Sequence, residues 1–399
     1  MKEQTVLRGF RFSAVSARVK EKGPERPDLG LIVSDSVCIT AAVTTTNLVY
    51  AAPVELTRER LAGGSCMAIL ANSGNANACT GRRGRDDAVN LTGEVARVLG
   101  IDPELVVPMS TGVIGVPLPV ERMTGQIPAL AAGLDPSRHG DFARSIMTTD
   151  LVPKTAVVEG SLSHCSIKLV GAAKGSGMIA PNMATMLAAV LSDVRVDIGF
   201  LRECLAEACE VSFNRITVDG DTSTNDTLVV MTGGASDAAD LGSAELDRRT
   251  FATMLARVCT DLARQIVLDG EGATKVVTIR VRGARGKPDA TRIARVIAES
   301  PLVKTAFHGE DPNWGRVLAA AGRAGVEFDP RVVDLFIGPV AVLHDGAPVE
   351  GDWERSAHAV MQEREWEAVL DLKSGQAEAE LLTTDLSEEY VGINADYRS

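Results

Sequence analysis

The 399-residue sequence predicts a mixed α/β (α+β) fold, because segments with helical spacing and segments with strand-type spacing of apolar residues both occur along its length. Apolar residues make up 45% and charged residues 24%, the balance of a globular protein rather than of a disordered chain. Aromatic residues are only 4% while glycine occurs 37 times. We therefore expect a core of aliphatic side chains and closely packed backbones, divided over two or three domains.

The first part of the chain carries strand signals. Two short apolar stretches, Leu31–Val33 and Val37–Val43, each predict a strand. Cys66–Ala71 is continuously apolar and stops at the turn-forming residues 72–75, which predicts a buried strand.

Two segments have the spacing of helices. Residues 85–99 repeat apolar positions at helical intervals, and Gly100 follows as a C-cap. The strongest helix pattern covers 246–268 and stops at Asp269-Gly270. Its apolar stripe, which we interpret as core rather than as a cofactor site, consists of Phe251, Leu255, Val258, Leu262 and Ile266.

The last third of the chain predicts more strands. Residues 277–281 alternate apolar and polar side chains, as a half-buried strand does. Asp334–Val342 predicts a strand that runs toward a turn at Asp345-Gly346. Between them the Gly/Pro/charged stretch 283–290 is a weak candidate for a domain boundary.

Composition excludes several classes of function. The net charge is −12, so nucleic-acid binding has no electrostatic support. No apolar run is long enough to span a membrane, and the first residues do not resemble a secretory signal. The seven cysteines contain no C-x-x-C pair, and we expect small buried side chains in a reducing compartment.

Two clusters of possible metal ligands are also poor candidates. The sequence His308-Gly309-Glu310-Asp311 is more typical of turns and hydrogen bonds than of a metal site. Asp219, Asp221 and Asp226 lack the spacing and the later Glu of a calcium loop. We expect no metal, and we interpret 218–227 as a structural segment beside a cleft.

The glycine-rich segment 171–187, GAAKGSGMIAPNMATML, is the richest in chemistry. It is not a phosphate loop, because Lys174 precedes Gly175 instead of ending a Gly-Lys-Ser/Thr motif, and no G-x-G-x-x-G spacing occurs. A flexible loop before a helix is the simpler interpretation of its composition.

A second interpretation concerns the Ala184-Thr185 bond within this segment. The hydroxyl of Thr185 could attack the preceding carbonyl, so that the chain passes through an ester and is cut. Thr185 would then carry a free α-amine, whose ordinary pKa of about 7.7–8.0 suits a base for its own hydroxyl. By spacing alone, an ordinary Ala-Thr pair within a helix or strand is favoured.

The segment KGSGMIAPNMATML resembles the cleavage motif of the ornithine acetyltransferase (glutamate N-acetyltransferase) family of arginine biosynthesis, the ArgJ family. Further similar motifs follow in order from about residue 9 to the last residue: GFRFSAVSARVK, ANSGNANACTG, PMSTGVIG, IMTTDLVPK, VDGDTSTNDT, DGEGATK, SPLVKTAFHGEDPNWGR and NADYRS.

The resemblance implies an architecture. It implies a layered αββα core, the self-cleaving amidase/ornithine acetyltransferase fold, with a smaller C-terminal domain. Self-cleavage would give an alpha chain of residues 1–184 and a beta chain of 185–399, which completes the core to about 285 and forms the small domain from about 286. The family is cytoplasmic in bacteria and assembles from two alpha and two beta chains, without a cofactor.

The resemblance also implies an activity. Thr185 takes the acetyl group from N-acetylornithine, ornithine leaves, and glutamate collects the acetyl group as N-acetylglutamate. Some members also use acetyl-CoA, and the sequence does not separate the two kinds. Two alternatives are an N-terminal-nucleophile amidase or aminopeptidase, in which water is the acceptor, and a non-enzymatic amino-acid binder.

Site residues follow from the family motifs. Thr111 and Gly112 would form the oxyanion hole, although an ordinary glycine turn fits the same letters. Substrate contacts are implied at Thr148, Lys174, Thr185, Glu271, Asn394 and Ser399. A surface lysine and a solvated loop carboxylate are the simpler interpretations of Lys174 and Glu271. Ser399 stands where the family often has Thr, and Asn72, Asn75 and Asn77 are expected to shape the pocket.

Overall fold

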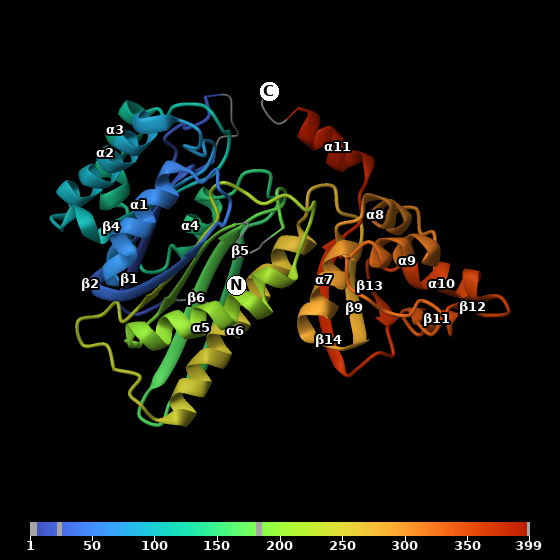
Figure 1. Cartoon of the computed structure of the whole chain (residues 1–399). Helices are drawn as coiled ribbons and strands as arrows, with labels where there is room; N and C mark the ends of the chain where they lie inside the picture. The colour runs from blue at the N-terminus through green and yellow to red at the C-terminus, as the bar shows by residue number, and fades with distance from the viewer. Residues whose placement is uncertain (1–5, 22–25, 181–185, 397–399) are drawn as a thin grey trace. The chain divides into compact units, whose positions relative to one another are not determined.

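The chain folds into two compact units, each built around its own β-sheet of parallel and antiparallel strands (Figure 1). The computed structural model describes residues 6–21, 26–180 and 186–396. The first unit contains Met1–Asn214 and Asp221–Ile266, and the second contains Arg215–Gly220 and Val267–Ser399. The predicted mixed α/β class is confirmed.

The described part of the first unit holds a sheet of eight strands, in the order β4-β3-β2-β8-β7-β6-β5 with β1 paired to β2. Pairs β3–β4 and β7–β8 are parallel, and the others are antiparallel. The strands are β1 (Phe10–Val15), β2 (Leu29–Thr44), β3 (Ser65–Asn72), β4 (Val106–Ser110), β5 (Lys154–Ser161), β6 (Ser166–Lys174), β7 (Leu187–Ser192) and β8 (Thr227–Thr232).

Strand β2 joins the two halves of this sheet. The stretches 31–33 and 37–43, predicted as separate strands, form one 16-residue strand with an irregularity between Val33 and Cys38. Its first part pairs with β1 and β3, and its last six residues pair with β8. An interruption in the apolar pattern therefore marks a bulge and not the end of a strand.

The first unit has the four layers of an αββα fold, as predicted. Apolar side chains from both halves of the sheet meet in one buried cluster, which includes Ile32, Ile69, Val170 and Leu187. The neighbouring residues along these strands point to the other face of the sheet, which the helices cover. Leu31 and Leu70 pack in a second cluster with α2 and α3, and Gly171 lies against α6. The helices of this unit are α1 (Ala52–Arg60), α2 (Gly81–Leu99), α3 (Val120–Ala132), α4 (His139–Ser145), α5 (Ile198–Val211) and α6 (Glu245–Leu268).

Two of these helices confirm sequence predictions. Gly100 ends α2 in the left-handed conformation, at φ 70°, and its N–H donates to the carbonyl of Ala96. The predicted stripe of α6 is fully buried at all five positions. Gly171 lets α6 approach β6, since a Cβ there would lie 2.7 Å from Val258 Cγ1.

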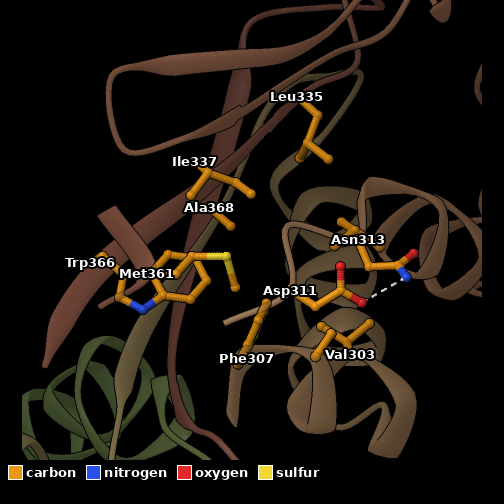
Figure 2. A pocket seen from close by; sticks show the side chains of 11 residues that line it. Val303, Phe307, Asp311, Asn313, Leu335, Ile337, Met361, Trp366 and Ala368 are labelled. Atoms are coloured by element: carbon orange, nitrogen blue, oxygen red, sulfur yellow. Dashed lines mark hydrogen bonds between the residues drawn. The ribbon is translucent and has the colours of Figure 1, made fainter. Parts of the chain in front are cut away.

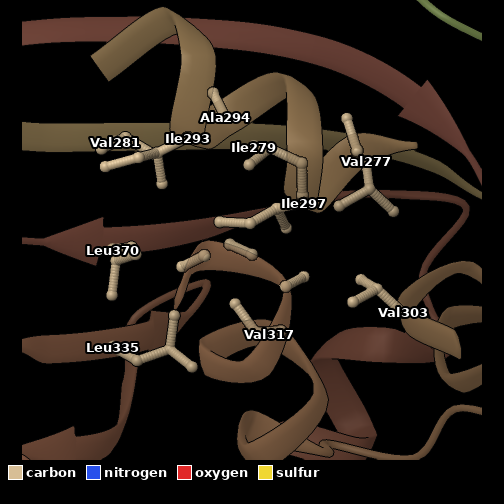
Figure 3. Close-up of a cluster of buried hydrophobic side chains, with 14 of the residues drawn as sticks. Val277, Ile279, Val281, Ile293, Ala294, Ile297, Val303, Val317, Leu335 and Leu370 are labelled. Atoms are coloured by element: carbon tan, nitrogen blue, oxygen red, sulfur yellow. The ribbon is translucent and has the colours of Figure 1, made fainter. Parts of the chain in front are cut away.

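The described part of the second unit holds a six-stranded sheet in the order β12-β11-β10-β13-β9-β14. Helix α7 lays Ile293 and Ile297 over Val277, Ile279 and Val281 of β9 (Figure 3). The alternation predicted for 277–281 is therefore confirmed. The strands are β9 (Val276–Ala284), β10 (Asp334–Ile337), β11 (Val340–His344), β12 (Ala347–Pro348), β13 (Glu365–Asp371) and β14 (Ala377–Thr384). The helices are α7 (Lys287–Ala298), α8 (Pro301–His308), α9 (Trp314–Gly322), α10 (Trp353–Met361) and α11 (Glu388–Ala395).

The single strand predicted over 334–342 was wrong. Strands β10 and β11 form a hairpin in which Ile337 pairs with Val340, and Gly338 adopts φ 53° in the two-residue turn between them. The prediction followed the apolar run and overlooked the Gly338-Pro339 dipeptide within it, which is a turn signal. The predicted turn at Asp345-Gly346 is confirmed, with φ of 46° and 70°.

The cysteines only partly follow the expectation of burial. Cys38, Cys66, Cys204, Cys209 and Cys259 are buried, whereas Cys79 is exposed and Cys165 is half-buried. Within the described part of the chain, no helix combines the length and the apolar character that a membrane crossing requires.

Candidate functional site

The carboxyl ends of β3 and β4 meet at one edge of the first sheet, since these parallel strands pair Asn72 with Ser110. Ser110 Oγ donates to Asn72 Oδ1 over 2.7 Å, and Asn72 Nδ2 donates to the carbonyl of Asn75 over 2.9 Å. Asn225 Nδ2 donates to the carbonyls of Ser110 and Ala76, over 2.8 and 2.6 Å. These buried side chains fix the backbone that precedes the turn at Thr111-Gly112.

Thr111 and Gly112 follow at this edge. The N–H of Thr111 donates to the carbonyl of Asn72 over 3.0 Å. Gly112 adopts φ 133°, and a Cβ on it would lie 2.3 Å from the carbonyl carbon of Gly74 and 2.4 Å from the nitrogen of Asn75. Only glycine fits this backbone, so packing alone already requires it, whatever its part in an oxyanion hole.

We expect Gly112→Ala to unfold locally, because a methyl group must push the 74–75 backbone away at an unfavourable φ. Gly125→Ala is the matched control: Gly125 lies within α3, and no atom is within 4 Å of its Cβ position. The control should be stabilised by about 0.5–1 kcal/mol. Thermal unfolding measures both effects, and a Gly112→Ala protein as stable as the parent would contradict the packing argument.

Lys174 reaches the same edge from β6. It is 8% exposed, so the surface-lysine interpretation was wrong. Its Nζ donates to Thr111 Oγ1 over 3.4 Å, and its Cα pairs with Leu187, the first residue of β7. The structure therefore brings together two site residues that are 63 positions apart in the sequence.

Thr148 is held beside a buried ion pair that sequence reasoning missed. Asp150 Oδ2 accepts from the N–H of Thr148 over 2.8 Å, and Asp150 Oδ1 accepts from Lys154 Nζ and from the N–H of Gly175, each over 2.7 Å. One carboxylate thus connects the loop of Thr148 to the turn that follows Lys174. Arg26 adds a second clamp by donating to the carbonyl of Thr148 over 2.5 Å.

Electrostatics keep this carboxylate ionised. Burial by itself would raise the pKa of Asp150, but the positive charges of Lys174 and Lys154, together with hydrogen bonds, outweigh burial and hold that pKa well below its usual range. Asp150 belongs to the IMTTDLVPK motif, yet nothing in one sequence distinguishes a buried aspartate from an exposed one.

Ala184 and Thr185 lie outside the described residues, but the chain on both sides is fixed by the 218–227 segment. Thr222 Oγ1 donates to the carbonyl of Ala180 over 3.2 Å, and the N–H of Thr227 donates to the carbonyl of Met186 over 2.9 Å. The segment interpreted from sequence as structural therefore anchors the flanks of the proposed cleavage point.

Glu271 and Asn394 come together in the second unit. Asn394 Nδ2 donates to Glu271 Oε2 over 2.8 Å. Glu271 is 8% exposed, so the solvated-loop interpretation was wrong. Gly272 keeps α11 close, because a Cβ there would lie 2.5 Å from the nitrogen of Tyr390, and Ser387 Oγ donates to the carbonyl of Gly272 over 2.6 Å. Ser399 lies outside the described residues.

His308 and Glu310, which the sequence offered as possible metal ligands, each contact another side chain of the protein. His308 Nδ1 lies 2.7 Å from Asp385 Oδ2, and Glu310 accepts from Lys275 Nζ over 2.7 Å. The one described cluster with metal-like spacing is Asp334, His344 and Asp345. Lys373 Nζ lies 2.7 and 2.8 Å from the carboxylates of Asp334 and Asp345 in that cluster and forms an ion pair with each of them.

A small cavity under α8 and α9 is unsuited to a substrate. Its volume is about 10 Å³, enough for a single water, and apolar side chains such as Phe307, Leu335 and Trp366 line most of it (Figure 2). Its polar lining residues, Asp311 and Asn313, bond to each other over 3.0 Å.

Comparison with known proteins gives long matches. The model of the ArgJ family matches residues 11–399. "Arginine biosynthesis bifunctional protein ArgJ" of Geobacter sulfurreducens is 48% identical over 393 residues, covering 98% of this chain and 100% of that protein. The protein of the same name from Symbiobacterium thermophilum is 47% identical over 395 residues, covering 99% and 98%.

Two solved structures carry related names. The arginine biosynthesis bifunctional protein ArgJ of Bacillus halodurans is 40% identical and covers 51% of this chain and 95% of its own, with a TM-score of 0.48. Ornithine acetyltransferase of Mycobacterium tuberculosis, solved as a complex with ornithine, is 32% identical and covers 46% and 95%, with a TM-score of 0.41.

Proposed function

Because the chain belongs to the ArgJ family, we propose that it is the acetyltransferase of arginine biosynthesis that moves the acetyl group of N-acetylornithine to glutamate. The family predicted from sequence motifs is thereby confirmed. The observation on the described residues that best supports the activity is the contact of the Lys174 ammonium with the Thr111 hydroxyl, at the sheet edge where β7 begins.

The proposed nucleophile is Thr185, freed by self-cleavage after Ala184 into chains 1–184 and 185–399. Its α-amine takes the proton of its hydroxyl, the oxygen attacks the acetyl carbonyl, and ornithine leaves. Glutamate then attacks the acetyl-Thr185 ester. A covalent intermediate suits this exchange because two similar amino acids use one pocket in turn.

Thr111 and Gly112 are the proposed oxyanion donors. Thr111 supplies a hydroxyl that Lys174 Nζ already contacts, so a positive charge lies beside the place where negative charge would develop. The hydrogen bond from the Thr111 N–H to Asn72 keeps the turn fixed before any substrate arrives. Rigid donors need no reorganisation during the reaction.

The proposed substrate contacts form two groups. Thr148 and Lys174 belong to the first unit, where the lysine charge suits the α-carboxylate that both substrates carry. Glu271 and Asn394 belong to the second, where a buried carboxylate suits the side-chain ammonium of ornithine. Thr185 and Ser399 complete the set. Ornithine is the ligand named in the Mycobacterium tuberculosis structure.

We further propose a cytoplasmic assembly of two alpha and two beta chains that needs no cofactor. The curated relatives are called bifunctional, and acetyl-CoA is the second acetyl donor that we propose to test. Incubation with N-acetylornithine and glutamate tests the main activity. Acetate without N-acetylglutamate would indicate an amidase instead, and formation of N-acetylglutamate from acetyl-CoA and glutamate would establish the second donor.

We expect Thr111→Ala to slow acetyl transfer by about 10²–10³-fold, the usual effect of removing one oxyanion donor. Thr111→Ser, which keeps the hydroxyl, should recover most of this loss. Turnover at saturating substrate measures both variants. Equal rates in the serine and alanine variants would show that the hydroxyl has no role.

A further inference from the structure

Glu271 lies in a tight turn of the second unit, between α6 and β9. The N–H of Ala273 donates to the carbonyl of Gly270 over 3.0 Å, so Glu271 and Gly272 are the two central residues of the turn. The direction of the Glu271 side chain therefore depends on how the backbone of this turn is held.

Asp385 holds the backbone directly after the turn. This residue is 4% exposed, and its Oδ1 accepts from the N–H groups of Thr274 and Lys275, each over 2.8 Å. Its Oδ2 accepts from the hydroxyl of Thr274 over 2.6 Å and lies 2.7 Å from His308 Nδ1. A single buried carboxylate thus binds two successive residues of the Glu271 loop, 110 and 111 positions away in the sequence.

Ser387 holds the turn itself. Its Oγ donates to the carbonyl of Gly272 over 2.6 Å and, as the N-cap of α11, accepts from the N–H of Tyr390 over 3.3 Å. Asn394 of the same helix donates to Glu271 Oε2. Helix α11 is therefore joined both to the backbone of the turn and to the carboxylate that the turn carries.

The segment that carries Asp385 and Ser387 is fixed in turn to α8. The ammonium of the buried Lys304 donates to the carbonyl of Thr384, and also to its hydroxyl over 3.1 Å. The N–H of Leu386 donates to the carbonyl of Lys304 over 3.2 Å. Both chain neighbours of Asp385 are thus anchored, so its carboxylate is a fixed point for the loop. We call Asp385 and Ser387 the turn clamp.

We propose that the turn clamp is a positioning and specificity-determining device, which holds the Glu271 carboxylate in place for acyl donors with a cationic side chain. This role rests on the function proposed above, in which Glu271 contacts the side-chain ammonium of N-acetylornithine. Asp385 and Ser387 act through the turn, because their contacts are with its backbone. A displaced turn misdirects the carboxylate, and a hydrogen bond to a charged group weakens steeply with poor geometry.

The test compares two acyl donors, with the full-length protein and glutamate as acceptor. N-acetylornithine carries the ammonium, whereas N-acetylnorvaline has the same carbon chain without it. The measured quantity is the ratio of the two kcat/KM values. Glu271→Gln should lower this ratio by about 10–100-fold, because a hydrogen bond between charged groups is lost.

Asp385→Ala should lower the ratio by about tenfold or more, because the loop loses three hydrogen bonds at once. Asp385→Asn keeps an oxygen for the two N–H groups and should recover most of the ratio. A general loss of structure would lower kcat/KM for both donors alike and leave the ratio unchanged.

Asp247→Ala is the matched control. Asp247 in α6 is also buried, accepts from the N–H and the hydroxyl of Ser163, and lies 3.6 Å from His164 Nδ1. These partners belong to the connection between β5 and β6. We expect this variant to be less stable than the parent but to keep the parent ratio.

Ser387→Ala covers the case in which Asp385→Ala folds poorly. It removes one hydroxyl from the turn clamp and should lower the ratio by about 3–10-fold, the effect of one hydrogen bond.

The outcomes separate this inference from the proposed function. A parent that forms no N-acetylglutamate from N-acetylornithine overturns the proposed function. A Glu271→Gln ratio equal to that of the parent overturns the role of Glu271 and the turn clamp with it. A ratio that falls in Glu271→Gln but stays at the parent value in Asp385→Ala and Ser387→Ala overturns the turn clamp alone.

Discussion

Thr185→Ala is expected to remain one polypeptide of 42.1 kDa and to transfer no acetyl group. The substitution removes the only atom that, in the proposed mechanism, attacks both the Ala184 carbonyl and the acetyl carbonyl of the substrate. The loss should therefore be at least as large as that of any other single substitution described here. Intact-mass analysis reports the cleavage, and N-acetylglutamate formation from N-acetylornithine reports the transfer.

Thr185→Ser is the matched control for this substitution, because serine keeps a hydroxyl at the same position. We expect it to be cut and to transfer acetyl groups more slowly than the parent. Acetyl transfer by an uncut Thr185→Ala chain would disprove the assignment of the nucleophile. Cleavage of Thr185→Ala at the parent rate would disprove the role of the hydroxyl in self-cleavage.

The sequence identified the residues of the site better than it identified the groups that surround them. The motif STG marked Thr111 and Gly112, but the reason why Gly112 must be glycine is the backbone of Gly74 and Asn75, which lies against it only in the folded chain. In the same way, Lys174 was identified from a glycine-rich motif, whereas its contact with Thr111, the residue after β4, is present only in the folded chain.

The environments of two buried carboxyl groups were the features of the site that could least be predicted from the sequence. Asp150 lies in the motif IMTTDLVPK and Asp226 in VDGDTSTNDT, and both are aspartates. The charges of Lys174 and Lys154 hold the pKa of Asp150 well below its usual range, whereas burial raises the pKa of Asp226 well above it, because the sheet places different groups around them. Local spacing cannot contain this information, since Asp226 meets residues near positions 45 and 186.

The fold was predictable where periodicity was long. The stripe of α6 repeats over five positions and is buried at each of them, because a helix must hide a continuous apolar face. Short strands were harder. Val33 and Cys38 lie in one strand across a bulge, and Gly338 divides what looked like a single apolar run. Strand boundaries depend on backbone conformation at single residues, which apolar spacing does not reveal.

Asp150→Ala is expected to lower the free energy of unfolding by about 3–5 kcal/mol at neutral pH, because it leaves Lys154 charged and unpaired in the core. Both side chains of this pair are fully buried, and their N–O distance is 2.7 Å. Asp261→Ala is the matched control. It breaks an ion pair with Arg257 of the same i,i+4 spacing, but on the exposed face of α6, and should cost less than about 1 kcal/mol. Denaturant unfolding of parent and variants measures the difference.

The pH dependence of unfolding gives the same pair a second signature. Since the folded-state pKa of Asp150 is depressed, its stabilisation is complete above about pH 4, the ordinary range of an aspartate, and is lost as the pH falls below that. The gap in stability between the parent and Asp150→Ala should therefore narrow on acidification. Replacing both partners, as Asp150→Leu/Lys154→Met, should be less destabilising than Asp150→Ala alone, because no buried charge is left unpaired. A double variant less stable than the single one, or a gap that does not change with pH, would mean that Asp150 stabilises the fold through its hydrogen bonds to Thr148 and Gly175 and not through its charge.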